Sequence, residues 1–235
     1  MIPKKIHYCW FGRKPLPQEV IKYMDSWRKF LPECEIKEWN ENNFNVNMFE
    51  YTKEAYFAKK YAFVSDVARL WALVKEGGIY FDTDILILKP FDPFFWRKKA
   101  FIGFEHNCYI GTSLIAAEPK HPFFLEFLNH YKTIHFFKGF NYDETTNVCR
   151  ITRLLLQKGL VANNTRQNIE DIDIYEQEFF CNKDWKTKEC YNSEKSYAIH
   201  DFQSSWISDS SNILKKIRKR FSYATTILSY KRYIK

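Results

Sequence analysis

The sequence predicts an α/β fold with a parallel, nucleotide-binding sheet and covering helices, and three observations lead to this prediction. Short β-rich runs alternate with amphipathic helical runs along the first half of the chain. The first of these runs opens into a loop, and α/β folds bind nucleotides at such strand ends. The run from Tyr61 to Pro90 reads as a helix, a tight turn and a buried strand that ends in paired carboxylates. A chain of 235 residues suits one such domain with a sizeable core.

The first elements follow from apolar spacing. Lys5 to Trp10 is a β-rich run and the expected first strand, and residues 11–17 form the loop after it. Glu19 to Phe30 places its apolar residues on one side of a helix, which Pro32 ends. Glu35 to Trp39 is the expected second strand, and Met48 to Lys60 is an aromatic-rich helix.

The central helix is predicted over Ala62 to Glu76, because its apolar residues recur at helical spacing: Phe63, Val67, Leu70, Trp71 and Val74. Gly77 and Gly78 end it, since a left-handed cap favours a residue without a Cβ. Strand-like runs follow at Ile79 to Phe81 and at Ile85 to Leu88.

Between these two runs lie Asp82 and Asp84, which an extended backbone places on the same side as Tyr80. Two buried carboxylates side by side repel each other unless a cation lies between them. Mn²⁺ or Mg²⁺ takes oxygen ligands and leaves sites open for phosphate oxygens. The pair therefore indicates metal-assisted handling of a diphosphate, whereas the alternative is a solvated polar loop.

The second half is less regular. Strands are expected at Ala100 to Phe104 and Thr112 to Ala117, and helices at Phe123 to Tyr131 and Glu144 to Gln157. Residues 91–99 are an expected loop. From Val161 to Ser196 the apolar pattern weakens, which is typical of variable loops. A last short strand is expected over residues 197–200.

The segment SDVARLWALVKEGGIYFDTDILILKP resembles the DXD segment of the family 32 glycosyltransferases. That family includes fungal initiating mannosyltransferases and bacterial capsule and lipopolysaccharide sugar transferases, and the large glucosylating toxins share its core. IPKKIHYCWFG near the N-terminus and YAIHDFQSSW near the C-terminus extend the resemblance. It implies a GT-A-type fold with a Rossmann-like sheet and a retaining, metal-dependent transfer from a UDP- or GDP-linked hexose. A glycan or lipid-linked glycan would be the acceptor, in surface polysaccharide synthesis.

The resemblance also implies roles for individual residues. Trp10 would stack on the nucleobase, with His7 and Gly12 nearby, although a core role for Trp10 is the alternative. The catalytic residues it implies are Asp66, Arg69, Asp82 and Asp84. The metal ligands would be Asp82, Asp84 and His200. The donor-binding set comprises His7, Trp10, Gly12, Ser65, Asp66, Arg69, Tyr80, Asp82 and Trp206.

Other polar residues leave alternatives open. His106 and Asn107 are candidates for the donor or acceptor side of the site, and an inert surface role is the alternative. Thr145, Thr146 and Asn147 lie near the start of a predicted helix, where they either face the acceptor or cap the helix.

The charge is concentrated in the tail. Asn212 to Lys235 contains eight basic residues and no acidic one, which equals the whole net charge of +8. We therefore expect no nucleic acid partner for the body. We expect a catalytic domain over 1–207 and a basic amphipathic helix over 208–235. That helix would either lie on an anionic membrane surface or pack on the domain.

The cysteines and the N-terminus favour a cytoplasmic protein, peripheral on the membrane if the tail binds it. The six cysteines are scattered without a Cys-x-x-Cys pair, and the N-terminus lacks a long apolar segment. Three classes of function agree with these patterns: a glycosyltransferase, a nucleotide-sugar hydrolase with the same metal site, and a non-catalytic nucleotide-sugar-binding module. Intact acidic and basic site residues argue against the binding module.

Overall fold

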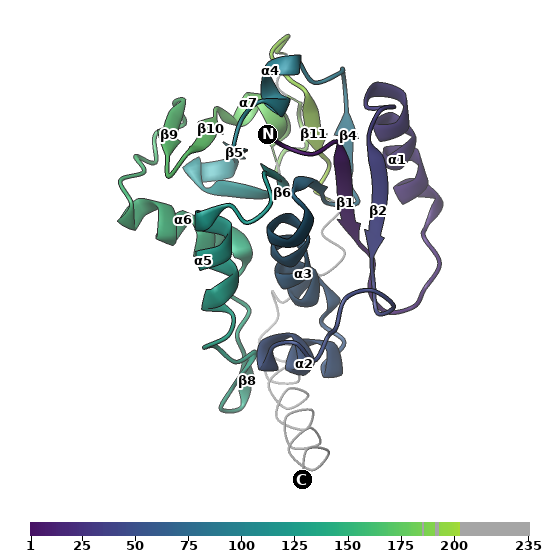
Figure 1. Cartoon of the computed structure of the whole chain (residues 1–235), viewed down its shortest axis with the longest axis vertical. Helices are drawn as coiled ribbons and strands as arrows, with labels where there is room; N and C mark the ends of the chain where they lie inside the picture. The colour runs from purple at the N-terminus through teal and green to yellow at the C-terminus, as the bar shows by residue number, and fades with distance from the viewer. Residues whose placement is uncertain (185, 191–192, 203–235) are drawn as a thin grey trace.

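The computed structural model describes residues 1–184, 186–190 and 193–202 (Figure 1). The boundary predicted near residue 207, the basic tail and Trp206 lie outside these residues. No helix in the described ranges has the length and apolar character to cross a membrane.

A seven-stranded mixed sheet forms the centre, in the order β2-β1-β3-β6-β5-β10-β9. Its strands are β1 (Lys5–Cys9), β2 (Glu35–Trp39), β3 (Gly78–Phe81), β5 (Ala100–Phe104), β6 (Ile110–Ala117), β9 (Gln167–Ile169) and β10 (Ile172–Tyr175). Two small sheets pair β4 (Ile85–Ile87) with β11 (Ala198–His200), and β7 (Phe137–Lys138) with β8 (Asn141–Tyr142).

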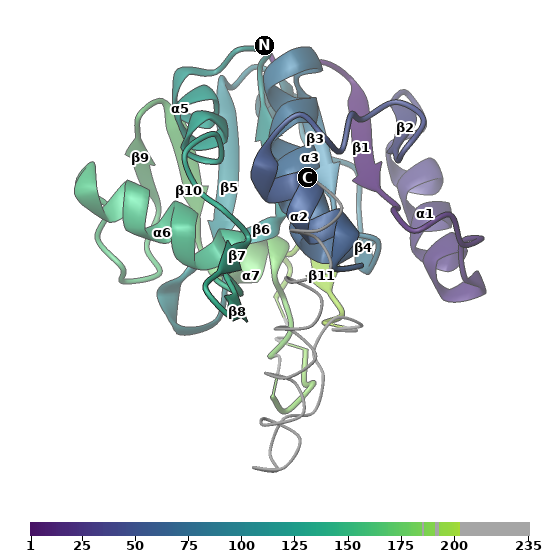
Figure 2. The ribbon, with the colours of Figure 1, turned by 90° about the horizontal axis from the view of Figure 1, so that it is seen from below.

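The helices cover both faces of this sheet (Figures 1 and 2). One face packs against α2 (Glu50–Phe57), α3 (Tyr61–Glu76), α5 (Pro122–His130) and α6 (Asn147–Gln157). The other face packs against the β4–β11 pair and three helices: α1 (Gln18–Phe30), α4 (Pro93–Trp96) and α7 (Gln177–Phe180). A short 3₁₀ turn, His106–Cys108, follows β5. The predicted α/β class, a central sheet with covering helices, is confirmed.

Five strands run in one direction. β1 is parallel to β2 and β3, β5 is parallel to β10, and β6 lies antiparallel between β3 and β5. The carboxyl ends of β1, β3, β5 and β10 therefore meet at one edge of the sheet. This edge is where an α/β sheet binds its ligand.

The structure corrects several element predictions. The sheet is mixed rather than parallel, because β6 and β9 run opposite to their neighbours. The segment 161–196 contains β9, β10 and α7, and β10 joins the central sheet. These elements are three or four residues long, too short for a periodic pattern. The short helix α4 lies inside the expected loop 91–99, and the pair β7–β8 was not predicted.

Alternation along the strands explains the two cores. In β1, Ile6 and Tyr8 face the α1 side, whereas Cys9 faces α3. Trp27 and Ser26 of α1 also hold the β4 backbone: the Trp27 indole donates to the Ile85 carbonyl, and Ser26 Oγ accepts from the Ile87 amide. These bonds fix the strand that directly follows the Asp-x-Asp turn.

The turn from α3 into β3 depends on glycine. Gly77 and Gly78 have φ of 64° and 111°, in the left-handed region. A Cβ at Gly78 would lie 2.6 Å from the Lys5 carbonyl oxygen in β1. The close approach of β1 and β3 therefore requires glycine here.

Replacing Gly78 with alanine should destabilise the fold more than the same change at Gly159. Both glycines have φ near 100°, but an added Cβ meets nothing within 4 Å at Gly159. We expect Gly78→Ala to cost about 1–3 kcal/mol more than Gly159→Ala, the range for overpacking. Urea unfolding of the two variants measures the difference, and equal losses would contradict the contact with β1.

Candidate functional site

Arg69 and two carboxylates form the buried centre of the site. Arg69 of α3 lies 3.0 Å from Asp66 Oδ1 and 3.3 Å from Asp82 Oδ1. Its Nη1 donates to the Thr112 carbonyl of β6 at 2.7 Å, and its Nε donates to the Ser65 carbonyl at 3.3 Å. The guanidinium therefore ties α3, β6 and the start of the Asp-x-Asp turn together.

Burial shifts the titration of this group. It raises the pKa of Asp66 to about 6, against the opposing attraction of the Arg69 cation. Burial disfavours the charged guanidinium, but the attraction of Asp82, Tyr80 and Asp66 raises the pKa of Arg69. Arg69 therefore remains a cation, and its charge favours the ionised form of the Asp66 carboxylate.

Tyr80 orients the Asp82 carboxylate, and Asn147 holds the backbone of Asp66. The Tyr80 hydroxyl donates to Asp82 Oδ1 at 2.7 Å, and its ring lies 4.6 Å beneath the Arg69 guanidinium. The Asn147 amide donates to the backbone carbonyl of Asp66 at 2.7 Å, and Asn147 in turn accepts from the Tyr131 hydroxyl. Helices α5 and α6 therefore position the backbone that carries Asp66.

The Asp-x-Asp turn brings Asp84 to His200. The Asp84 Oδ1 lies 3.4 Å from His200 Nε2, because β11 pairs with β4 directly after the turn. Burial opposes a charged imidazole, but hydrogen bonding to Asp84 and to Cys181 raises the pKa of His200 well above its usual range. The Asp201 amide donates to the Asp84 carbonyl at 3.0 Å and closes the turn.

Asp82, Asp84 and His200 together offer three ligand atoms that lie within 4.8 Å of one another. Two carboxylate oxygens and one imidazole nitrogen suit a divalent ion such as Mn²⁺. The side chains come from one turn and one facing strand, so the backbone already brings them together. This donor set fits the predicted metal site.

Glu105 is a site residue that the sequence did not reveal. It follows β5 at the carboxyl edge, and burial raises the pKa of its carboxyl to about 7, with opposing influences from His200 and Asp82. Its neighbours His106 and Asn107 were the candidates named from the sequence. His106 lies 3.7 Å from Asp184, and the side chain of Asn107 lies outside the described part. A lone acid in a loop carries no motif signal.

Trp10 and Gly12 follow the carboxyl end of β1, and Ser65 lies on α3 directly before Asp66. Trp10 directly follows Cys9, whose thiol is influenced by the charges of Arg69 and Asp82. Its indole donates to the Lys14 carbonyl, and the ring remains partly exposed. Gly12 donates its amide to Glu41 at 2.7 Å, and a Cβ there would meet Tyr61 of α3 at 2.5 Å. Ser65 is half-buried on α3.

His7 does not belong to this group, which corrects the donor-binding prediction. It is 0% exposed, its Nδ1 accepts from the Trp39 indole at 3.0 Å, and its Nε2 lies 2.7 Å from the Gly77 carbonyl. Burial lowers its pKa, so it is a neutral imidazole. His7 links β2 to the turn before β3 instead of facing a ligand.

At the start of α6, the capping alternative holds for Thr146. Its hydroxyl accepts from the Cys149 amide, and the helix begins at Asn147 rather than Glu144. The Asn147 side chain is buried against Asp66 as described above, so it supports the site from behind.

Residues 17–101 match the model of a glycosyltransferase sugar-binding region containing a DXD motif. The match includes Asp66, Arg69, Asp82 and Asp84, and the resemblance to the family 32 glycosyltransferases is confirmed. His200 and Glu105 lie beyond the matched residues.

Two relatives with similar sequences are named as a glycosyltransferase and a mannosyltransferase. An uncharacterized glycosyltransferase of Acanthamoeba polyphaga mimivirus is 27% identical over 225 residues, covering 88% of this chain and 84% of that protein. Inositol phosphoceramide mannosyltransferase 1 of Schizosaccharomyces pombe is 26% identical over 152 residues, covering 60% of this chain. The chain spans 44% of that yeast protein's length.

Among solved structures, the PaToxG glycosyltransferase is 20% identical with a TM-score of 0.47, covering 67% of this chain and 69% of that one. The galactosyltransferase LgtC, in complex with donor and acceptor sugar analogues, is 10% identical with a TM-score of 0.48. This match covers 94% of this chain and 95% of the LgtC chain.

Replacing Arg69 with methionine should strongly destabilise the glycosyltransferase region, because the buried carboxylates lose their cation. We expect a loss of about 3–5 kcal/mol in the free energy of unfolding. Arg28 provides the control: it also pairs with an aspartate three residues away, Asp25, but its side chain is 54% exposed against 7% for Arg69. Arg28→Met should cost below about 1 kcal/mol in denaturant unfolding. Similar losses in both variants would contradict the central role of Arg69.

Proposed function

We propose that this chain is a metal-dependent, retaining glycosyltransferase that moves a hexose from a nucleotide diphosphate sugar to a glycan or lipid-linked acceptor. The observation that carries the proposal is the group Asp82, Asp84 and His200 at the carboxyl edge of the sheet, within a chain that has a DXD-type sugar-binding region. Residues Asp82, Asp84 and His200 would hold Mn²⁺ or Mg²⁺. When bound, the ion supplies charge stabilisation for a diphosphate leaving group.

The protein's own groups orient the donor. Asp66 presents a carboxylate next to the proposed metal site, and a carboxylate accepts hydrogen bonds from sugar hydroxyls. The nitrogens of Arg69 are already engaged by Asp66, Asp82 and backbone carbonyls. We therefore propose that Arg69 acts by fixing these two carboxylates, with the acceptor hydroxyl attacking on the face from which the diphosphate leaves.

The nucleoside would lie over the end of β1. Trp10 would stack on the base, and Gly12, Ser65 and Tyr80 would line the path towards Asp82. The parallel strands β1 and β3 support this, because their carboxyl ends place Trp10 and Asp82 at one edge. Trp206 would complete the donor site, but it lies outside the described residues.

The acceptor and the membrane are further parts of the proposal. The yeast relative is named for mannosyl transfer to inositol phosphoceramide, which supports testing lipid-borne acceptors. The basic residues 212–235 would hold the enzyme at an anionic membrane surface, as a peripheral protein in surface polysaccharide synthesis.

The decisive experiment is a panel of UDP- and GDP-hexoses with Mn²⁺, with and without a glycan acceptor. Transfer to the acceptor with the same anomeric configuration supports the proposal. Release of free sugar alone, with or without the acceptor, would instead identify a nucleotide-sugar hydrolase. Binding without either product would identify a binding module.

Removal of the metal should abolish transfer. We expect no turnover in EDTA, recovery on adding Mn²⁺, and no turnover in Asp82→Ala or Asp84→Ala, since each variant loses a carboxylate ligand. Asp25→Ala is the control, because Asp25 is an exposed aspartate on α1. Undiminished activity in EDTA would refute the metal dependence.

Loss of the Trp10 ring should weaken nucleotide binding. We expect Trp10→Ala to lose about 1–3 kcal/mol of nucleoside diphosphate affinity, the contribution of one stacked base, as measured by calorimetry. Trp71→Ala is the control, because Trp71 is also a half-buried tryptophan but packs on the α3 side of the core. If Trp10→Ala lowers the melting temperature but not the nucleotide affinity, Trp10 is a core residue.

A further inference from the structure

Asp201 directly follows β11 and lies opposite the Asp-x-Asp turn. The last residue of β11, His200, is paired with Ile85, the first residue of β4. One step further along both chains, the Asp201 amide donates to the Asp84 carbonyl at 3.0 Å. The segment that carries His200 is therefore held to the backbone of Asp84 one residue beyond the small sheet, and the position of Asp201 sets how His200 faces the turn.

The Asp201 carboxylate is held by two other segments of the chain. The Tyr23 hydroxyl of α1 donates to Asp201 Oδ2 at 2.6 Å, and Lys183 forms an ion pair with Oδ1. Hydrogen bonds to an ionised acceptor are stronger than those between neutral groups. The side chain of Asp201 is 29% exposed and that of Lys183 is 16% exposed, so water only partly screens these contacts. Asp201 thus joins the Asp-x-Asp turn to α1 and to the segment after α7.

Helix α1 is a fixed anchor for Tyr23. Trp27 lies four residues after Tyr23, on the same face of the helix. Trp27 and Ser26 bond to the backbone of β4, at 2.7 and 3.0 Å. Helix α1 therefore holds β4 directly, and it holds the end of β11 through the bond from Tyr23 to Asp201. Both strands of the small sheet are tied to one helix.

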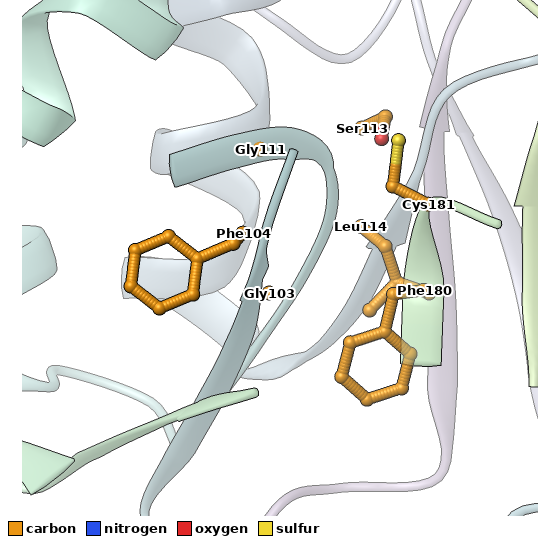
Figure 3. Close-up of a pocket in the computed structure, with 7 residues that line it drawn as sticks. All are labelled: Gly103, Phe104, Gly111, Ser113, Leu114, Phe180 and Cys181. Atoms are coloured by element: carbon orange, nitrogen blue, oxygen red, sulfur yellow. The ribbon is translucent and has the colours of Figure 1, made fainter. Parts of the chain in front are cut away.

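Lys183 also belongs to a packed part of the chain, because it lies three residues after the end of α7. Figure 3 shows Phe180, the last residue of α7, around one small cavity with Gly103 and Gly111 of the central sheet. A Cβ at Gly103 would lie 3.1 Å from the Phe180 ring, so the end of α7 packs closely on β5. The ion pair therefore links Asp201 to the central sheet through α7.

Asp201 is not itself one of the proposed metal ligands. In the part of the chain that the structure describes, the group whose ligand atoms all lie within 4.8 Å of one another is Asp82, Asp84 and His200. Asp201 touches two of these residues through the backbone: it bonds to the Asp84 carbonyl, and it follows His200 in the chain. Groups that orient metal ligands contribute to metal affinity without touching the ion.

We propose that Asp201 is a positioning residue for the metal site and that Tyr23 is its anchor on α1. The Tyr23 hydroxyl and the Lys183 ammonium fix Asp201, and Asp201 in turn fixes the backbone of Asp84 and the end of β11 that carries His200. The inference rests on the proposed metal-dependent function. It assigns part of the Mn²⁺ affinity to a tyrosine that lies 178 residues before Asp201 in the sequence.

Removal of the Tyr23 hydroxyl tests this assignment in the full chain. Tyr23→Phe keeps the ring and every charge, so a change in metal affinity cannot come from a lost charge near the ion. Electron paramagnetic resonance titration gives the Mn²⁺ dissociation constant at fixed pH. We expect Tyr23→Phe to bind Mn²⁺ about 10-fold more weakly, at the lower end of the range for outer partners of metal ligands.

Tyr8→Phe is the matched control. The Tyr8 hydroxyl also donates to a carboxylate at 2.6 Å, that of Glu38, but this bond joins β1 to β2 and lies outside the proposed positioning group. Tyr8→Phe should therefore bind Mn²⁺ with wild-type affinity, whatever its effect on the melting temperature.

A double-mutant cycle shows whether Tyr23 acts through Asp201. Asp201→Ala keeps the backbone amide that bonds to Asp84 but loses the carboxylate, and we expect it to bind Mn²⁺ about 10- to 100-fold more weakly. In this background, Tyr23→Phe should cause no further loss of Mn²⁺ affinity, because the acceptor of its hydroxyl is already absent.

The outcomes separate this inference from the proposed function. Wild-type Mn²⁺ affinity in Tyr23→Phe, or an equal loss in Tyr8→Phe, would overturn the anchoring role of Tyr23. A loss caused by Tyr23→Phe that persists in the Asp201→Ala background would overturn the role of Asp201. Equal melting temperatures for Tyr23→Phe and Tyr8→Phe, with Mn²⁺ affinity lost in the first alone, would support both roles. Wild-type protein that binds Mn²⁺ no better than Asp82→Ala would refute the metal site itself.

Discussion

The buried guanidinium of Arg69 is the interaction on which the rest of the site depends. A cation this deeply buried is stable only when anions and carbonyls surround it. Asp66, Asp82 and the Thr112 carbonyl meet that requirement from α3, from the Asp-x-Asp turn and from β6. The same contacts set the position of α3 over the sheet, so the packing of the core and the geometry of the candidate site share one cause.

The proposed metal ligands connect the Arg69 cluster to the small sheet formed by β4 and β11. Asp82 belongs to the Arg69 cluster, whereas Asp84 faces β11, which α7 and β4 support. Helix α1 holds β4 through Trp27 and Ser26. One turn of the chain thus couples two packed layers, and a shift in either layer would change the distances between the proposed metal ligands.

Two residues of the N-terminal segment IPKKIHYCWFG, His7 and Trp10, have different surroundings. His7 is used inside the sheet, where it connects the Trp39 indole to the Gly77 carbonyl. Trp10 follows the end of the strand and keeps part of its ring exposed. The motif therefore combines a residue that links strands inside the sheet with one that is partly exposed at the strand end.

The sequence alone determined the local elements and the Asp-x-Asp motif. Helix α3 was predicted to within one residue at its start, because apolar residues at a period of 3.6 and a terminal glycine pair are local signals. Asp82 and Asp84 were singled out by their spacing within one short segment, and the resemblance to the family 32 glycosyltransferases pointed to Asp66 and Arg69.

Only the tertiary structure decided which distant residues join them. The reversed β6, the inclusion of β10 in the sheet and the burial of His7 depend on pairing between strands far apart in the chain. Glu105 approaches the site because β5 ends at the same edge of the sheet as β3. A single glutamate has no periodic pattern of its own, so its place appears only when long-range packing brings the strand ends together.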